Sequence, residues 1–286
     1  MSPGRPCRPC RAPLDTFVRI DGVPHHVVVE GAGPVCVLSA GLGMAWYDWD
    51  AVTALLAPYR TVVRFDRPGL GLSGPARAAP TLAAEADRIL HVLDACGLPG
   101  PATLVGHSLA GLHCEAAARR HPDRVARLVL VDSSVEERAR PRPSPGLRVG
   151  AARLCGALLG AAGLPYVLGP ALRRASVFLA RTGGGDPAPY ELVRRTYGTS
   201  RSLRAMVAEH ATYLDVAAQL AVLRRQSGLS AGLPVTVLTA GADRRWLRRQ
   251  RRLAALLAAD HRISPESGHL LMLDHPHDVA AAVRGA

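Results

Sequence analysis

The stretch "ATLVGHSLAGLHCEAAARRHP" (residues 102–122) places one serine, Ser108, between a strand-like run and a helix-like run. A strand–turn–helix around G-x-S-x-G presents a serine hydroxyl above the carboxyl edge of a sheet, where it can act as a nucleophile. Here the second glycine is displaced by one residue, because Ala110 stands in its place and Gly111 follows. Alanine adds only a methyl group, so we expect the turn to form, with Gly111 relieving the crowding. The alternative is an ordinary connection that happens to contain a serine.

A serine hydroxyl is a weak nucleophile and needs a base beside it. In this arrangement the chain order is serine, then an acid, then histidine. His269 stands in a Ser-Gly loop near the C-terminus, in "SPESGHLLMLDHP" (264–276). We therefore predict that His269 is the base for Ser108.

The acid should follow a strand, and two aspartates do so. Asp243 comes after the apolar run 234–240, and Asp132 ends the run "LVLVD" (128–132). We predict Asp243, because its strand directly precedes the histidine loop. Asp132 is the rival.

Acyl transfer also requires two backbone N–H groups that bind the oxyanion. One should come from Leu109, which begins the helix after Ser108, and the other from Leu42 in "GLGMAW" (41–46). Gly41 and Gly43 allow the backbone to approach a ligand closely, so Gly41 is a predicted substrate-binding residue. The alternative is that these glycines only form a strand–helix turn.

Apolar strand-like runs alternate with helix-like runs along most of the chain, which indicates a mostly parallel sheet with helices on both faces. Residues 17–31 predict a β-hairpin that opens this α/β core. Residues 135–228 contain no convincing strand and several helical runs. We therefore expect a disordered tail at 1–14, a core at 15–134 and 229–286, and a helical insertion at 135–228.

The net charge of +12 does not by itself indicate a nucleic-acid partner. All 35 basic residues are arginine, and together with abundant alanine, glycine and proline this is typical of a GC-rich bacterial genome. The arginines are scattered except at 244–252, which fits a solvated helix face with Trp246 and Leu253 turned inward. No recognised nucleic-acid-binding motif accompanies them.

Cysteine usage and the N-terminus favour a cytoplasmic protein with reduced thiols. Cys7 and Cys10 form one C-x-x-C pair, and no second pair exists to complete the roughly four ligands of a structural zinc site. We therefore expect no metal site and leave the role of this pair open. The N-terminal residues lack the apolar stretch of a secretory signal.

Residues 154–172 are 19 uncharged residues between Arg153 and Arg173, long enough to span a bilayer. They contain four glycines and two prolines, which favour short broken helices in a soluble protein over a membrane segment. Whether this segment touches a membrane is left open. We expect the short helices to form a lid, with Leu159 and Leu168 lining the mouth of the site.

Four stretches together resemble the α/β-hydrolase fold superfamily. "LSAGLGMAWYDW" (38–49) resembles its oxyanion loop and "FDRPGLGLSGP" (65–75) a characteristic turn. "GHSLAG" (106–111) resembles its nucleophile elbow and "ESGHLLMLDHP" (266–276) its histidine loop. The resemblance extends from about residue 17 to the C-terminus.

This resemblance implies an eight-stranded sheet with a helical cap at 135–228, and a triad of Ser108, His269 and Asp243. The His-Gly often found at the oxyanion loop is Ala40-Gly41 here, which removes a side-chain contribution but keeps the backbone donor. A serine nucleophile argues against haloalkane dehalogenase and epoxide hydrolase relatives, which use aspartate.

The sequence therefore predicts a cofactor-free serine hydrolase that acts on an ester, thioester or lactone with an apolar acyl part. Acyl transfer or carbon–carbon bond hydrolysis by the same residues is a second interpretation. A non-catalytic hydrolase fold that binds a ligand is a third. We expect a small-molecule substrate and no nucleic-acid partner, while substrate identity and oligomeric state are left open.

Overall fold

The computed structural model describes residues 14–137, 139–241 and 243–285. The predicted tail at 1–14, apart from Leu14, lies outside these residues, as do Cys7 and Cys10.

One sheet runs through the described part of the chain. Its eight strands are β1 (Leu14–Ile20), β2 (Val23–Glu30), β3 (Val35–Ser39), β4 (Thr61–Phe65), β5 (Ala102–His107), β6 (Val125–Val131), β7 (Val235–Ala240) and β8 (Asp260–Ser264). They lie in the order β1-β2-β4-β3-β5-β6-β7-β8. β2 pairs antiparallel with β1 and with β4, and the remaining neighbours pair parallel. The predicted mostly parallel α/β sheet is confirmed.

The N-terminal hairpin forms where the sequence predicts it. Asp21 (φ 51°) and Gly22 (φ 72°) connect β1 to β2. Two successive positive φ angles are the signature of a tight type I′ turn, which aspartate and glycine tolerate.

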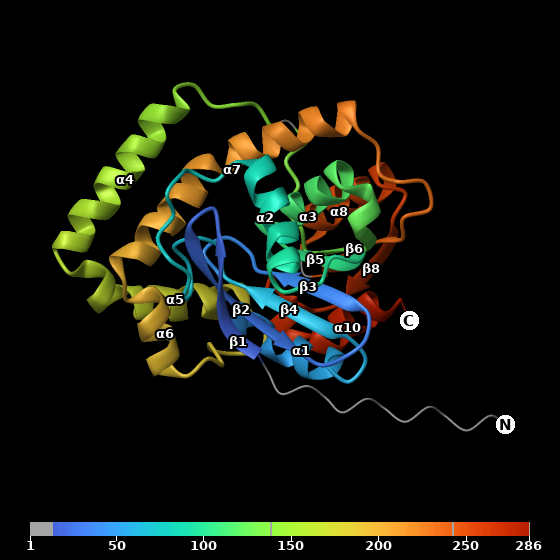
Figure 1. Cartoon of the computed structure of the whole chain (residues 1–286), viewed down its shortest axis with the longest axis horizontal. Coiled ribbons are helices and arrows are strands. Elements are labelled where there is room, and N and C mark those ends of the chain that lie inside the picture. The colour runs from blue at the N-terminus through green and yellow to red at the C-terminus, as the bar shows by residue number, and fades with distance from the viewer. Residues whose placement is uncertain (1–13, 138, 242, 286) are drawn as a thin grey trace.

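Helices cover both faces of the sheet (Figure 1). They are α1 (Asp50–Leu56), α2 (Leu82–Ala95), α3 (Leu109–Arg120), α8 (Arg244–Leu256), α9 (Leu271–Asp274) and α10 (Pro276–Arg284), with short 3₁₀ turns at Trp46–Trp49 and Pro122–Arg124. β5 is buried on both sides, since Leu104 belongs to the apolar cluster with α2 and α3 while Val105 belongs to the cluster with α1 and α10. Alternate strand residues point to opposite faces, so both faces of β5 must be apolar.

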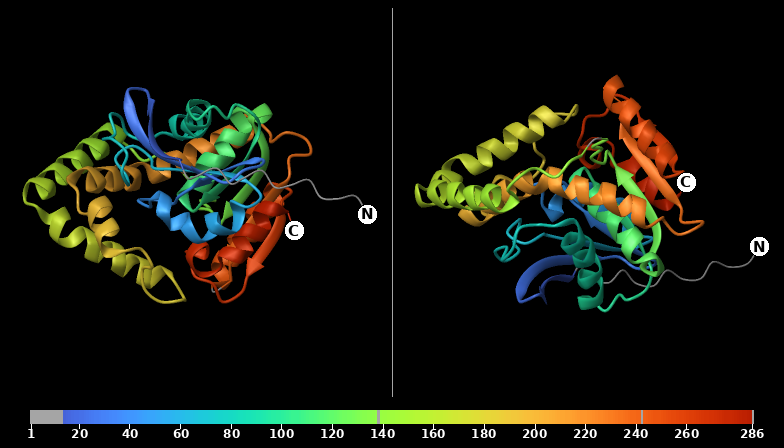
Figure 2. Two further views of the ribbon diagram at one scale, coloured as in Figure 1. Left: turned by 60° about the horizontal axis from the view of Figure 1, so that its bottom comes forward. Right: turned by 90° about the horizontal axis from the view of Figure 1, so that it is seen from above.

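In the described residues, four helices follow β6 and precede β7. They are α4 (Pro145–Ala161), α5 (Leu164–Ala180), α6 (Tyr190–Tyr197) and α7 (Ser200–Gln226). Figure 2 shows α4 at the end of the molecule opposite β7 and β8, with α5 and the long α7 running back from it. The structure thus places helices, and in the described residues no strand, within the segment 135–228.

The expectation of short broken helices over residues 154–172 is right about a break and wrong about the length of the helices. Two helices of 17 residues each, α4 and α5, meet at a single break at Ala162 and Gly163. Gly156 and Gly160 do not break α4, because they allow it to pack closely on α7: a Cβ there would lie 2.7 Å from Arg204 Cγ and 2.5 Å from Ser200 Oγ. The glycines therefore serve close helix packing.

In the described part of the chain, no single helix is both long and apolar enough to cross a membrane. α4 and α5 reach that length and apolarity only when taken together, and they are bent by 107° at the break between them.

Candidate functional site

Ser108 lies at the sharp turn between β5 and α3. Its backbone has φ 51° and ψ −122°, in a region that residues other than glycine rarely occupy. The turn is held on both sides: Ser108 N donates to the carbonyl of Val131 at 3.1 Å, and Ser108 O accepts from Gly111 N at 3.0 Å and Ser134 N at 3.1 Å. Strain of this kind persists only where neighbouring contacts fix it, and it gathers at functional sites.

The displaced glycine of the motif has a structural reason. Ala110 is fully buried without disturbing the turn. Gly111 packs against the next strand end, where a Cβ would lie 2.1 Å from Ser133 Oγ. The expectation that Gly111 relieves local crowding is confirmed.

The loop after β8 brings His269 to Ser108, with its Nε2 3.0 Å from Ser108 Oγ. Its Nδ1 lies 2.5 Å from Oδ2 of Asp132. Nδ1–H donates to this carboxylate, which leaves the Nε2 lone pair to accept from the serine hydroxyl.

His107 fixes the backbone of the histidine loop. Its Nε2–H donates to the carbonyl of His269 at 2.9 Å. Burial lowers the pKa of His107 well below its usual range, so this ring stays neutral beside His269.

The choice of Asp243 as the acid is corrected by the structure, because the carboxylate that contacts His269 belongs to Asp132. Asp243 is exposed and begins α8, where its side chain accepts from Arg245 N at 2.7 Å. Asp132 follows directly after β6, and β6 lies beside β5 in the sheet. Asp132 is therefore close to the turn that carries Ser108. The histidine loop reaches back across β7 to meet it.

Asp132 is held in place by its second oxygen. Oδ1 accepts from Ala240 N at 2.9 Å and from Trp246 Nε1 at 2.7 Å. The side chain is buried, and its backbone has φ 42°. These two donors orient the carboxylate so that Oδ2 faces His269. One of them is Trp246, which the sequence predicts to face inward.

The two predicted oxyanion donors lie in two different segments of the backbone. Leu109 is the first residue of α3, and the first N–H groups of a helix have no partner within it. Leu42 lies in the turn after β3 and lines the same cavity as Ser108. Gly41, predicted to bind substrate, is not among the residues that line this cavity. It is buried behind the turn, where a Cβ would lie 2.6 Å from Nδ1 of His107, so only glycine fits there.

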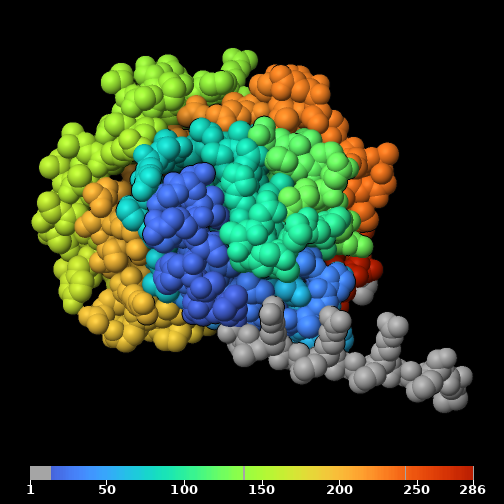
Figure 3. All heavy atoms as spheres, in the orientation of Figure 1, coloured from blue at the N-terminus to red at the C-terminus, as the bar shows by residue number. Residues whose placement is uncertain are grey.

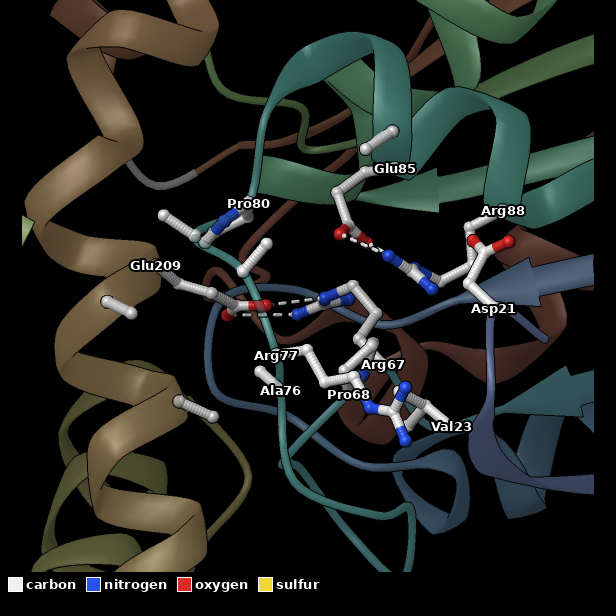
Figure 4. Close-up of a pocket in the computed structure, with 15 residues that line it drawn as sticks. Asp21, Val23, Arg67, Pro68, Ala76, Arg77, Pro80, Glu85, Arg88 and Glu209 are labelled. Carbon is white, nitrogen blue, oxygen red and sulfur yellow. Dashed lines mark hydrogen bonds and ion pairs between the residues drawn. The ribbon is translucent and has the colours of Figure 1, made fainter. Parts of the chain in front are cut away.

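A buried ion pair ties this turn to α7. Arg67 donates to the Glu209 carboxylate through Nε at 2.6 Å and through Nη2 at 3.1 Å, and also to the carbonyls of Ala40 and Gly41. Glu209 in turn accepts from Gly43 N at 2.8 Å. Figure 4 shows this pair on the wall of a small cavity of about 200 Å³, next to a second pair, Glu85 and Arg88.

Sequence reasoning missed Glu209. Arg67 stands in the characteristic turn at 65–75, but Glu209 is one acidic residue in a long helix and has no local signal. Only the packing of α7 on the oxyanion turn identifies it.

Replacing Glu209 by alanine is expected to lower the free energy of unfolding by about 3–5 kcal/mol, because it leaves the buried Arg67 without a counter-ion. Urea unfolding monitored by circular dichroism measures this loss. The control is Glu191→Ala, which removes the partner of the exposed Arg194 and should change stability far less. Equal losses in the two variants would contradict a stabilising role for the buried pair.

A cavity of about 640 Å³ opens beside Ser108 and His269. Apolar side chains of α4, α5 and α7 form much of its wall, including Leu159, Leu164, Leu168, Leu172, Val177, Leu203 and Met206. The predicted lining residues Leu159 and Leu168 are both among them.

Two polar side chains of α5 and α6 at the cavity, Arg173 and Tyr197, already bond other groups of the protein. Arg173 pairs with Asp48 and Asp186. The Tyr197 hydroxyl donates to the carbonyl of Gly43 at 2.8 Å. With these groups bound to protein partners, the cavity suits an uncharged apolar ligand.

In the described residues, no group of three or more His, Cys, Asp or Glu side chains could hold a metal ion. Cys36 and Cys114 are free and buried, and burial raises the pKa of each thiol to about 12. Neither thiol is a nucleophile at neutral pH.

Comparison with known proteins identifies the family. Residues 36–282 match the family model described as "Alpha/beta hydrolase family". The pimeloyl-[acyl-carrier protein] methyl ester esterase of Klebsiella pneumoniae (strain 342) is 40% identical over 98 residues, which cover 34% of this chain and 36% of that protein. The chain matches the curated relatives over less than half of their own length.

Solved structures agree with this fold. The Cif epoxide hydrolase from Acinetobacter nosocomialis superposes with a TM-score of 0.76 at 19% identity, over 96% of this chain and 89% of the other. The thioesterase domain from the curacin biosynthetic pathway superposes with a TM-score of 0.70 at 16% identity, over 96% and 100%. At these identities the structures show the fold alone.

Proposed function

We propose that this chain, which belongs to the alpha/beta hydrolase family, is a hydrolase that cleaves an ester, thioester or lactone with an apolar acyl part through an acyl-enzyme on Ser108. One observation carries the proposal. The hydrogen-bonded row Ser108–His269–Asp132 lies at the wall of an apolar cavity. A nucleophile, a base and a group that orients the base are what acyl transfer by serine requires.

In the proposed reaction, His269 Nε2 takes the proton of Ser108 as Oγ bonds to the substrate carbonyl carbon. The N–H groups of Leu42 and Leu109 donate to the oxygen that becomes negative. The carbon–oxygen or carbon–sulfur bond then breaks, and His269 gives its proton to the leaving alcohol or thiol. Water repeats the sequence and releases the acid, while Asp132 holds the Nδ1 proton and stabilises the imidazolium.

The experiment that tests this function combines a covalent probe with a substrate series. A fluorophosphonate should label the purified protein at Ser108, and p-nitrophenyl esters of increasing chain length should be hydrolysed. We expect kcat/KM to rise from acetate toward longer acyl chains, because longer chains bury more apolar surface in the cavity. Absence of both labelling and hydrolysis would favour a non-catalytic ligand-binding protein.

Helices α4 and α5 are proposed to act as a lid that selects the acyl chain. Leu168→Asp should lower kcat/KM for a long acyl ester by about tenfold or more, because it puts a charge into the apolar cavity. The same change should affect the acetate ester much less, since acetate does not reach that part of the cavity. The matched control is Leu154→Asp, an exposed residue outside the cavity wall, and equal effects in the two variants would contradict the lid role.

A further inference from the structure

The two helices α4 and α5 expose a large apolar surface. We define this α4–α5 apolar surface by Leu147, Leu154, Leu158, Tyr166, Val167, Leu172, Phe178 and Leu179, each of which is exposed. Figure 3 shows α4, in yellow-green, along the rim of the molecule with its outer side uncovered. Large exposed hydrophobic side chains on the rest of the described chain are spread over separate elements. A gathered apolar surface of this kind marks an interaction site, whereas single exposed residues do not.

Charge around this surface is positive. Arg153, Arg174, Arg195 and Arg204 on helices α4–α7 are exposed. The acidic side chains of these helices are engaged in ion pairs: Glu191 with Arg194, Glu209 with Arg67 and Asp215 with Arg148. Asp186, in the loop between α5 and α6, pairs with Arg173. The exposed arginines therefore give this end of the molecule a net positive field.

The cavity beside Ser108 borders the same surface. Leu172 lines the cavity and is also 64% exposed, so it belongs to both. Leu159 of α4 and Leu164 of α5 flank the cavity from the two helices. The α4–α5 apolar surface and the cavity therefore meet at Leu172.

We propose that the α4–α5 apolar surface docks on an anionic lipid surface. Amphipathic helices bury their apolar side at the boundary of headgroups and acyl chains, and arginines add attraction to anionic headgroups. The two helices follow each other with a bend of 107°, and both carry exposed apolar side chains that can enter the lipid. A second copy of this chain fits less well, because the net charge of +12 sets like charges against each other.

The test is flotation of the purified chain with lipid vesicles, carried out on the Ser108→Ala protein so that no lipid is hydrolysed. Docking therefore succeeds or fails independently of the proposed hydrolase function. We expect flotation with vesicles of phosphatidylcholine and phosphatidylglycerol, weaker flotation with phosphatidylcholine alone, and a decrease as salt is raised.

Two variants on different helices locate the docking surface. Leu154→Glu on α4 (62% exposed) and Val167→Glu on α5 (68% exposed) should each weaken vesicle binding by about tenfold or more. In the protein that retains Ser108, both should leave turnover of a soluble short-chain ester unchanged. The matched control is Leu256→Glu, 63% exposed on the arginine-rich α8, which should bind as the parent does.

Each other outcome overturns the proposal. Failure to float with either vesicle excludes lipid docking. Loss of binding in Leu256→Glu alone places the contact on α8 and not on α4 and α5. A dimer in analytical ultracentrifugation that Leu154→Glu and Val167→Glu dissociate would assign the surface to a second copy of the chain.

Discussion

Replacement of Ser108 by alanine is expected to lower kcat/KM for a p-nitrophenyl ester by about 10⁴–10⁶-fold. The reason is that Oγ of Ser108 is the atom His269 contacts, at 3.0 Å, and no acyl-enzyme can form without it. The fold should persist, since the backbone contacts that hold this turn are unchanged by the loss of the hydroxyl. Steady-state kinetics, with circular dichroism as the check on folding, measure the effect.

The matched control for this variant is Ser176→Ala. Ser176 lines the same cavity, but its hydroxyl donates to the carbonyl of Leu172 within its own helix. Its loss should change turnover by a small factor only. A Ser108→Ala protein that keeps near-native turnover would exclude Ser108 as the nucleophile.

Local patterns were sufficient to predict the serine turn and the histidine loop. A strand, a tight turn and a helix follow one another within residues 102–120, so sequence periodicity and small residues report on them directly. The apolar strands β3, β5, β6 and β7 were recognised for the same reason: burial on both faces leaves a continuous apolar run.

The acid could not be chosen by local pattern, because the choice depends on which strand lies beside β5. Asp132 and Asp243 both come after apolar strands, and the sequence does not state the order of strands in the sheet. What separates them is non-local. Asp132 lies at the end of the strand next to β5, while Asp243 is used as the N-cap of α8.

Close helix packing explains the other errors of the sequence analysis. Gly156 and Gly160 suggested broken helices, since glycine has a low helix propensity. In the structure they permit close contact with α7, and the surface buried in that contact offsets their low helix propensity. The pairing of Glu209 with Arg67 depends on the same placement of α7 and so was equally hidden.

Asp132→Asn is expected to lower kcat by about 10⁴-fold, by analogy with the corresponding change in a well-studied serine enzyme. The hydrogen bonds of this chain give the reason. Ala240 N and Trp246 Nε1 both donate to Oδ1, so in the variant they hold the amide oxygen at that position. The amide NH₂ then faces Nδ1 of His269, which must accept and carry its proton on Nε2. In that tautomer His269 cannot take the proton of Ser108.

The matched variant is Asp243→Asn, which should keep near-native kcat. Asparagine caps a helix about as well as aspartate, so α8 and Trp246 should keep their positions. Measured together on one ester substrate, the two variants separate the orienting role of Asp132 from a general effect of removing a carboxylate near the end of the sheet. A reversed ranking would mean that the carboxylate 2.5 Å from His269 does not orient it during turnover and that Asp243 does.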